Sequence, residues 1–261
     1  MATPTTTALT RVALEISAPV ARISLQNPPL NVIDIPMMRE LQQVLAEIES
    51  RADISTIVIA GSGRAFSAGV DIKAHTPDKI DEMLREFHGV IRALVATKKV
   101  TICAVRGACL GGGAEVALVC DMVFTARDAT WGFPEIKLGC YPPVAAVALP
   151  LLVGQKLAEE LILTGRQISG DEAVAIGLAN KSARSEEVDA IVSDTLDHLQ
   201  QLSPAALAVT KKAIYAWDAI HFDKGLARAE KIYLEELMRT HDAQEGITAF
   251  LEKRAPQWRG N

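Results

Sequence analysis

Three consecutive glycines, Gly111, Gly112 and Gly113, constrain this chain more than any other feature. They follow an apolar, strand-like run at residues 100–105, and a helix-compatible segment with Glu115 in its first turn comes next. Glycine at such a junction lets a ligand approach the backbone closely, and the free N–H groups of a helix start favour negative charge. The junction therefore predicts a site for a phosphate or for a developing oxyanion, with a plain tight turn as the alternative.

The residues around the glycines favour the oxyanion. The run LGGGAE lacks both the lysine of a phosphate-binding P-loop and the GxGxxG spacing of a dinucleotide site. A second carboxylate, Glu135, follows a Trp-Gly-Phe-Pro run. Glu115 and Glu135 both lie in mostly apolar sequence, where a glutamate either finds a partner or has a raised pKa. For either glutamate alone, a solvated surface position is the alternative.

Composition excludes several classes of protein. The 261 residues suffice for one large domain, or for one domain with a small appendage. The net charge of −5 gives no basic footprint, so we expect no nucleic-acid partner. The four cysteines lack paired CxxC spacing, so we expect buried thiols and no metal site. The N-terminus does not resemble a signal peptide and no apolar stretch is long enough for a membrane span, so we expect a cytoplasmic protein.

Hydrophobic periodicity predicts an alternation of strands and helices. We expect strands at residues 12–16, 20–25, 54–60, 100–105, 122–125 and 178–181. We expect helices at residues 35–51, 78–97, 144–153, 155–164, 169–176, 185–202, 204–217, 222–239 and 242–254. The unit strand, strand, helix recurs between residues 12 and 125, and by itself it predicts an α/β protein with mostly buried strands.

The five histidines are interpreted as structural residues. His88 lies within an expected helix, and no catalytic partner is apparent near it in the sequence. The same interpretation holds for His75, His198, His221 and His241, because no Ser/His/Asp order presents itself.

Three sequence blocks carry a family resemblance. They are AFSAGVDIK at residues 65–73, RGACLGGGAE at 106–115 and GFPEIKLG at 132–139. In order and separation they resemble the enoyl-CoA hydratase (crotonase) family, and the resemblance covers almost the whole chain. It implies an α/β crotonase-like spiral of ββα repeats at residues 1–200, which carries the active site. It also implies a C-terminal helical region at 201–261 for trimerisation and for a lid.

The resemblance also assigns site residues. It places the two oxyanion-hole amides on Val70 and Gly112. It places contacts to the substrate and its coenzyme A on Ala68, Asp71, Ile72, Lys73, Pro143, Phe250 and Lys253. Coenzyme A is then part of the substrate, an acyl-CoA thioester, and no separate cofactor or metal is needed. The expected assembly is a homo-trimer or a dimer of trimers, since Leu226, Ile232, Tyr233, Leu237 and Phe250 form apolar stripes that an appendage could not bury alone. Burial within the chain's own core is the alternative for these stripes.

Two glutamates indicate the reaction class. Hydratases of the family carry glutamates at both positions, and this chain has Glu115 and Glu135. The resemblance implies that Glu115 mainly holds and activates water and that Glu135 mainly exchanges a proton with the substrate carbon. Two neighbouring carboxylates titrate as a pair, so this division of roles stays open.

One departure bears on the acyl group. After the second glutamate, ordinary hydratases have a glycine-rich P-G-A-G-G run, whereas this chain has Pro-Pro-Val-Ala-Ala at 142–146. That run resembles the branch of the family that hydrates cyclohexa-1,5-diene-1-carbonyl-CoA in anaerobic aromatic degradation. A short-chain 2-enoyl-CoA hydratase is the alternative enzyme. A non-catalytic acyl-CoA-binding or RNA-binding member of the fold is the alternative of another class; the two intact glutamates disfavour lost catalysis, and the acidic balance disfavours RNA.

Overall fold

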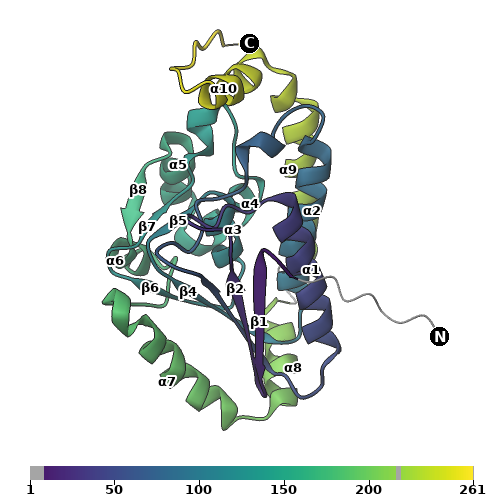
Figure 1. Ribbon diagram of the computed structural model, residues 1–261, viewed down its shortest axis with the longest axis vertical. Helices are drawn as coiled ribbons and strands as arrows, with labels where there is room; N and C mark the ends of the chain where they lie inside the picture. Colours follow the sequence, from purple (N-terminus) through teal and green to yellow (C-terminus); the bar gives the residue numbers. More distant parts are fainter. Residues whose placement is uncertain (1–8, 216–218, 261) are drawn as a thin grey trace, which may run out of the picture.

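The computed structural model describes residues 9–215 and 219–260, and it is a mixed α/β structure (Figure 1). Its strands are β1 (Val12–Ser17), β2 (Val20–Leu25), β3 (Thr56–Gly61), β4 (Val100–Val105), β5 (Ala108–Leu110), β6 (Met122–Ala126), β7 (Thr130–Gly132), β8 (Gln167–Ser169) and β9 (Lys181–Ala183). Six of them form one sheet in the order β1-β2-β3-β4-β6-β9, and β5, β7 and β8 form a second. Only the β1–β2 pair is antiparallel in the larger sheet.

The two sheets are built by successive turns of a spiral. Each turn supplies a long parallel strand to the larger sheet, then a short segment to the smaller one. Ser67 after β3, Cys109 after β4 and Trp131 after β6 are neighbours across the smaller sheet. A helix follows the short segment of the first two turns, α2 after Ser67 and α3 after Cys109. The strand, strand, helix unit expected from the sequence is therefore confirmed.

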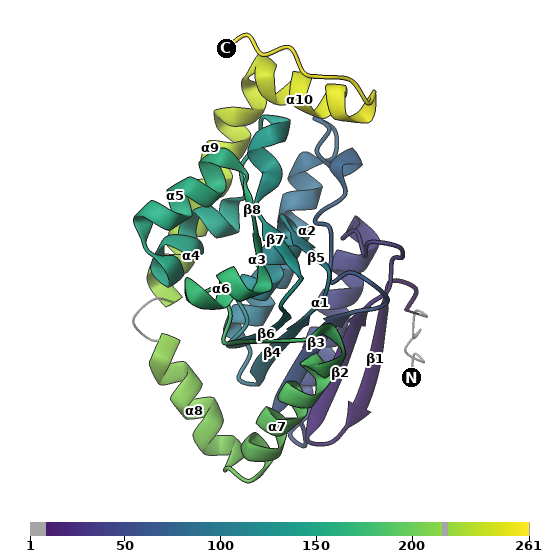
Figure 2. The ribbon, with the colours of Figure 1, turned by 90° about the vertical axis from the view of Figure 1, so that its left-hand side faces the viewer.

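The helices pack around and below the sheets (Figures 1 and 2). They are α1 (Ile35–Ser50), α2 (Ile80–Ala96), α3 (Gly112–Leu118), α4 (Pro143–Val153), α5 (Gln155–Thr164), α6 (Gly170–Ala175), α7 (Val188–Gln200), α8 (Pro204–Tyr215), α9 (Ala219–Glu235) and α10 (His241–Leu251). Short 3₁₀ turns lie at Ile72–Ala74, Pro134–Leu138, Ser185–Glu187 and Leu237–Arg239. The prediction for 204–217 extends beyond the described residues at 216–218, and His221 has no described side chain.

Local chemistry explains where several helices begin. The Asp34 carboxylate accepts a hydrogen bond from the Met37 N–H at 2.9 Å and so caps α1. Ser169 caps α6 in the same way through the Glu172 N–H at 3.1 Å. The bounds of one strand and one helix differ from those expected from the sequence. The strand expected at 178–181 lies at Lys181–Ala183, and α9 begins three residues earlier than expected and ends before a 3₁₀ turn.

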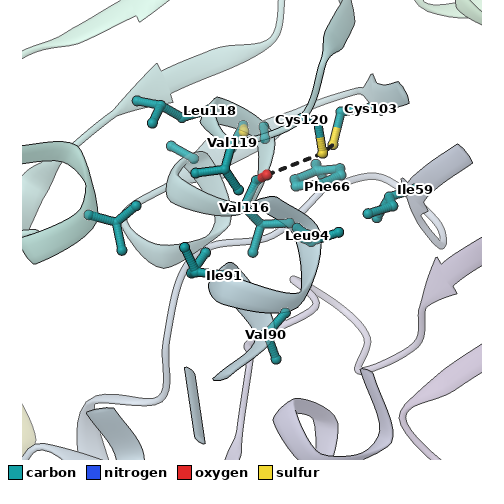
Figure 3. Close-up of a cluster of buried hydrophobic side chains, with 14 of the residues drawn as sticks. Ile59, Phe66, Val90, Ile91, Leu94, Cys103, Val116, Leu118, Val119 and Cys120 are labelled. Carbon is teal, nitrogen blue, oxygen red and sulfur yellow. Dashed lines mark hydrogen bonds between the residues drawn. The ribbon is translucent and has the colours of Figure 1, made fainter. Parts of the chain in front are cut away.

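The apolar faces of α2 and α3 meet over the larger sheet (Figure 3). Val90, Ile91 and Leu94 of α2 lie in one buried cluster with Val116 of α3 and with Ile59 of β3. All four cysteines are buried and free, whereas the apolar runs of the sequence predicted burial for three of them. This packing fixes the start of α3, and with it the glycine junction, against the core.

The long helix α9 lies along α4 and reaches α2 (Figure 2). Leu226 and Tyr233 of α9 are 0% and 2% exposed, so they are buried within the chain itself. Our assignment of these two residues to a stripe that needs a partner subunit was wrong. Ile232 and Phe250, in contrast, are 36% and 51% exposed. Within the described residues, no helix is both long and apolar enough to cross a membrane.

Candidate active site

A cavity opens where the glycine junction, α2, α4 and α9 meet. The 3₁₀ turn Pro134–Leu138 and the segment after Ser67 close its remaining sides. Its lining is mostly apolar and includes Ala68, Gly69, Val70, Ile72, His75, Met83, Leu84, Phe87, His88, Gly111, Gly112, Glu115, Pro134, Glu135, Leu138, Tyr141, Pro142, Pro143 and Tyr233. Both predicted carboxylates and both predicted oxyanion-hole residues thus line one cavity.

Two glycines of the junction are needed for close approach. Gly111 has φ of +50°, and a Cβ there would lie 2.6 Å from the Glu135 Oε1 atom. A Cβ on Gly112 would lie 2.6 Å from the Val70 Cγ2 atom and 3.1 Å from the Phe87 Cζ atom. Separations below 3.0 Å are not tolerated without movement. The glycines therefore let the second carboxylate and the Val70 segment pack directly on the start of α3.

Two backbone amides at this junction have no protein acceptor. The Gly111 N–H donates to the Gly132 carbonyl at 2.9 Å, which ties β5 to β7. Among the described residues, neither the Gly112 N–H nor the Val70 N–H donates to another protein group. Val70 bridges to Ile33 through the N–H of Asp71 and the carbonyl of Gly69, which leaves its own N–H outside that pairing. Two unpaired donors lining one cavity can stabilise an oxyanion.

The carboxylate of Glu115 is held by the start of α4. Its Oε1 atom accepts hydrogen bonds from the N–H groups of Val144 and Ala145, both at 2.9 Å. Pro143 is the first residue of α4, where the missing N–H costs nothing and the fixed φ favours a helix start. Glu115 is only 3% exposed. Its position is therefore fixed by two amides and by the positive end of a helix dipole.

Glu135 is held differently. It lies in the 3₁₀ turn Pro134–Leu138, and its buried Oε2 atom has no hydrogen-bond partner in the part of the chain that the structure describes. Burial raises the pKa of Glu115 to about 7, against the lowering effect of the two α4 amides. Burial and the neighbouring Glu115 carboxylate raise the pKa of Glu135 to about 8. Since Glu115 accepts two amide hydrogen bonds and the pKa of Glu135 is raised further, we assign the negative charge of the pair to Glu115 and the proton to Glu135.

The other predicted contacts are distributed unevenly. Ala68, Ile72 and Pro143 line the cavity. Asp71 caps the 3₁₀ turn at Ile72–Ala74 through the Lys73 N–H at 3.1 Å, and neither side chain lines the cavity. Phe250 at the end of α10 and Lys253 after it are exposed and do not line it either. The 3₁₀ turn at Ile72–Ala74 does pack against α10, so the predicted coenzyme A contacts lie in adjoining elements.

Sequence reasoning missed one wall of the cavity. His75 and His88 both line it, although both were interpreted as structural residues. His88 is fully buried, and its Nδ1 atom lies 2.6 Å from the Glu230 Oε1 atom of α9. This partner is 142 positions away, so it was not apparent near His88 in the sequence. A signal was present in the sequence. His88 continues the apolar series of Leu84 and Ile91 at helical spacing, which indicates a buried polar side chain.

Known proteins share this sequence and fold. Residues 15–261 match the model of a family described as Enoyl-CoA hydratase/isomerase. A cyclohexa-1,5-dienecarbonyl-CoA hydratase of Thauera aromatica is 37% identical over 248 residues, which are 95% of this chain and 96% of that protein. A probable enoyl-CoA hydratase of Bacillus subtilis is 36% identical over 255 residues, which are 95% of this chain and 98% of that protein.

Similarity extends to solved structures. The crystal structure of an enoyl-CoA hydratase from Mycobacterium avium subsp. paratuberculosis matches with a TM-score of 0.87 at 26% identity, covering 97% of this chain and all of that one. The fold is therefore the crotonase spiral that the three sequence blocks predicted. With the family match, the curated relatives and the fold in agreement, the chain belongs to the enoyl-CoA hydratase/isomerase family and is a hydratase.

Proposed function

We propose that this enzyme adds water reversibly to the conjugated double bond of an acyl-CoA thioester, with Glu115 and Glu135 as its acid–base pair. The observation that carries the proposal is the meeting of these two buried carboxylates with the unpaired amides of Val70 and Gly112 in one cavity. As water adds, negative charge develops on the thioester oxygen. The two amides meet that charge, and such donors are typically worth about 3–4 kcal/mol each.

The two glutamates take different parts because their surroundings differ. Glu115, charged and fixed by the Val144 and Ala145 amides, accepts a proton from the attacking water. Glu135, protonated in the resting site, donates a proton to the substrate carbon. The pair then exchanges roles for dehydration. The chemistry draws only on backbone amides and carboxylates, so the proposal includes no metal or separate cofactor.

For the acyl group we propose a cyclic dienoyl thioester, cyclohexa-1,5-diene-1-carbonyl-CoA, as formed in aromatic degradation. Two observations support this choice. The relative from Thauera aromatica carries that activity in its name. Pro142 and Pro143 line the cavity and make the start of α4 stiff, and a rigid wall suits a flat ring better than a flexible chain. A short-chain 2-enoyl-CoA hydratase is the second candidate, and the Bacillus subtilis relative is named a probable enoyl-CoA hydratase.

The deciding experiment measures kcat/KM for hydration of cyclohexa-1,5-diene-1-carbonyl-CoA and of crotonyl-CoA by the same preparation. We expect the cyclic diene to be hydrated with the higher kcat/KM. Replacing residues 143–146 with Gly-Ala-Gly-Gly should reduce the difference between the two kcat/KM values, since it removes the rigid ring of Pro143 and the bulk of the Val144 side chain. Faster hydration of crotonyl-CoA would replace the cyclic assignment with the short-chain one. Hydration of neither thioester would overturn the hydratase proposal and favour the binding-protein alternative.

The remaining parts of the proposal concern coenzyme A, assembly and compartment. The coenzyme A portion would be contacted by Lys73 and by Phe250 and Lys253 of a neighbouring copy. The assembly would be a trimer or a dimer of trimers, which would cover the exposed side chains of Ile232 and Phe250. The compartment that we propose is the cytoplasm. Light scattering at micromolar concentration tests the assembly, because a stable monomer would contradict it.

A further inference from the structure

Two buried side-chain atoms lack a hydrogen-bond partner within residues 9–215 and 219–260, and they belong to residues that line the same cavity. They are Glu135 Oε2 and His88 Nε2. Leaving a buried polar group unpaired costs about 1–3 kcal/mol, so each such group in a folded protein needs an explanation. The proton transfer of hydration explains the first atom. Nothing in that chemistry uses the second.

The orientation of the His88 ring is set by α9. Its Nδ1 atom lies 2.6 Å from Glu230 Oε1, and the Arg92 guanidinium lies 2.9 Å from Glu230 Oε2. Burial raises the pKa of Glu230, but hydrogen bonds from His88 and Arg92 outweigh it and hold the pKa below its usual value. Glu230 is therefore ionised and can only accept, so the hydrogen of the pair lies on Nδ1. In the neutral ring Nε2 is then an acceptor without a donor.

His88 is connected to the oxyanion junction through its neighbour Phe87. Its ring centroid is 5.9 Å from that of Phe87. The Phe87 ring in turn packs on Gly112, where a Cβ would lie 3.1 Å from the Phe87 Cζ atom. The neighbouring cavity residues of α2, Met83 and Leu84, are apolar. His88 thus places one acceptor in an otherwise apolar helical wall, next to the part of the cavity that would hold the acyl group.

We propose, on the basis of the hydratase function argued above, that His88 Nε2 accepts a hydrogen bond from a hydroxyl group on the acyl portion of the bound thioester. Hydration creates such a hydroxyl, so the acceptor favours the hydroxyacyl product and other hydroxylated acyl thioesters over unhydroxylated ones. Glu230 and Arg92 are positioning residues, because they fix the tautomer and the ring orientation without lining the cavity. His88 is a specificity-determining residue.

The test compares two ligands that differ by one hydroxyl group. Isothermal calorimetry measures the Kd of cyclohexanecarbonyl-CoA and of 2-hydroxycyclohexanecarbonyl-CoA. All proteins carry Glu135→Gln, so that the hydroxylated thioester is not dehydrated during the titration. Onto this background we place His88→Leu, Glu230→Gln and, as a matched control, His198→Leu on the exposed side of α7.

His88→Leu should weaken binding of the hydroxylated thioester about tenfold, the equivalent of one hydrogen bond, and leave the other thioester within about twofold. Glu230→Gln keeps the shape of the side chain and should lose part of the same selectivity, while His198→Leu should change neither Kd. A ratio of the two Kd values that is unaltered in His88→Leu overturns the proposal. If that variant does not fold, an unaltered ratio in Glu230→Gln overturns it. Failure of the hydratase proposal is separate, since it appears as absent turnover in the wild-type enzyme.

Discussion

Two glutamates near one cavity are in different protonation states: Glu135 lines the cavity on its glycine-rich side, and the half-buried Glu230 lies behind His88 on its helical side. On the glycine-rich wall, Glu135 has a buried oxygen without a partner and a second carboxylate nearby, and burial raises its pKa to about 8. On the helical wall, Glu230 is bonded to His88 and Arg92, and these bonds outweigh burial and lower its pKa. The comparison teaches that burial raises the pKa of a carboxylate unless hydrogen bonds and charged partners, such as those of Glu230, outweigh it.

The glycine-rich side and the helical side of the cavity are therefore expected to have different roles. The glycine-rich wall holds a carboxylate pair that shares one proton, beside two free amides, so it can respond to charge that changes during a reaction. On the helical side, Glu230 is held by hydrogen bonds to His88 and Arg92, so this network can orient a group. Substitutions on the first wall should therefore affect kcat most, and substitutions on the second should affect binding selectivity.

The largest effect is expected for Glu135→Gln and Glu115→Gln. Each removes a proton-transfer group and keeps the shape of the side chain, and a general acid or base is typically worth about 10²–10⁴ in rate. We expect kcat for hydration to fall by that factor, while the Kd of an unreactive acyl-CoA stays within a few fold. Discontinuous assays at high enzyme concentration would measure the residual rate of hydration.

Glu15→Gln is the matched control, because Glu15 is an exposed residue of β1 and lies outside the cavity. It should leave kcat unaltered. Near-wild-type turnover by either active-site variant would remove that glutamate from the mechanism and would break the contrast between the two walls.

A smaller effect is expected for Gly112→Ala. The added Cβ would lie 2.6 Å from Val70 Cγ2, so the Val70 side chain or the backbone that carries the two amides must shift, and we expect the oxyanion geometry to be disturbed. Loss of one such donor costs about 10²–10³ in kcat. Val70→Ala in the same chain removes the Cγ2 atom that the new methyl group would contact. We expect the double variant to recover part of the lost kcat. The contact with Phe87 at 3.1 Å prevents full recovery.

The kinetics of the single and double variants settle whether the junction acts through geometry. Equal kcat in Gly112→Ala and wild type would show that the added methyl group does not displace an amide on which the rate depends. A double variant no faster than Gly112→Ala would show that the loss does not arise from the clash with Val70. Thermal unfolding of each variant separates these outcomes from loss of the fold.

The glycine-rich wall could be predicted from the sequence because its parts are local. Gly111, Gly112 and Glu115 occupy one strand-to-helix junction, and the helix that begins at Gly112 fixes their relation. Glu135 lies 20 residues further on, in the next turn of the spiral. Its place in the site was predicted from the order of the three sequence blocks that resemble the family. The bonds from Val144 and Ala145 to Glu115 were not predicted, since nothing in the sequence shows which carboxylate meets the start of α4.

The helical wall could not be predicted in the same way. His88 and Glu230 are 142 positions apart, and only the packing of α9 against α2 brings them together. Tyr233 lies one turn beyond Glu230 and was assigned to an interface because a helical apolar stripe does not show what it packs against. Periodicity predicts which face of a helix is buried, but the partner of that face depends on the whole topology.

The last prediction concerns the pH dependence of kcat/KM. Close to neutral pH the expected change in kcat/KM is smaller than the changes expected for the substitutions above. Glu115 must be ionised to accept a proton, and burial raises its pKa to about 7, so kcat/KM should fall below that pH as Glu115 becomes protonated. Glu135 must be protonated to donate, and its pKa is raised to about 8, so kcat/KM should fall above that pH.

The expected profile is therefore a narrow bell, with each limb approaching a tenfold change per pH unit. We assign the limbs to the carboxylate pair. Burial raises the pKa of Cys140 to about 11 and that of Tyr141 to about 12, above both limbs. Glu230→Gln should leave both limbs in place even where it alters ligand selectivity, since Glu230 stays ionised across this range. Initial rates from pH 5 to 10 would measure the profile. A profile that is flat between pH 5 and 7, or limbs that move in Glu230→Gln, would show that the two walls do not divide proton transfer and orientation as their hydrogen bonds indicate.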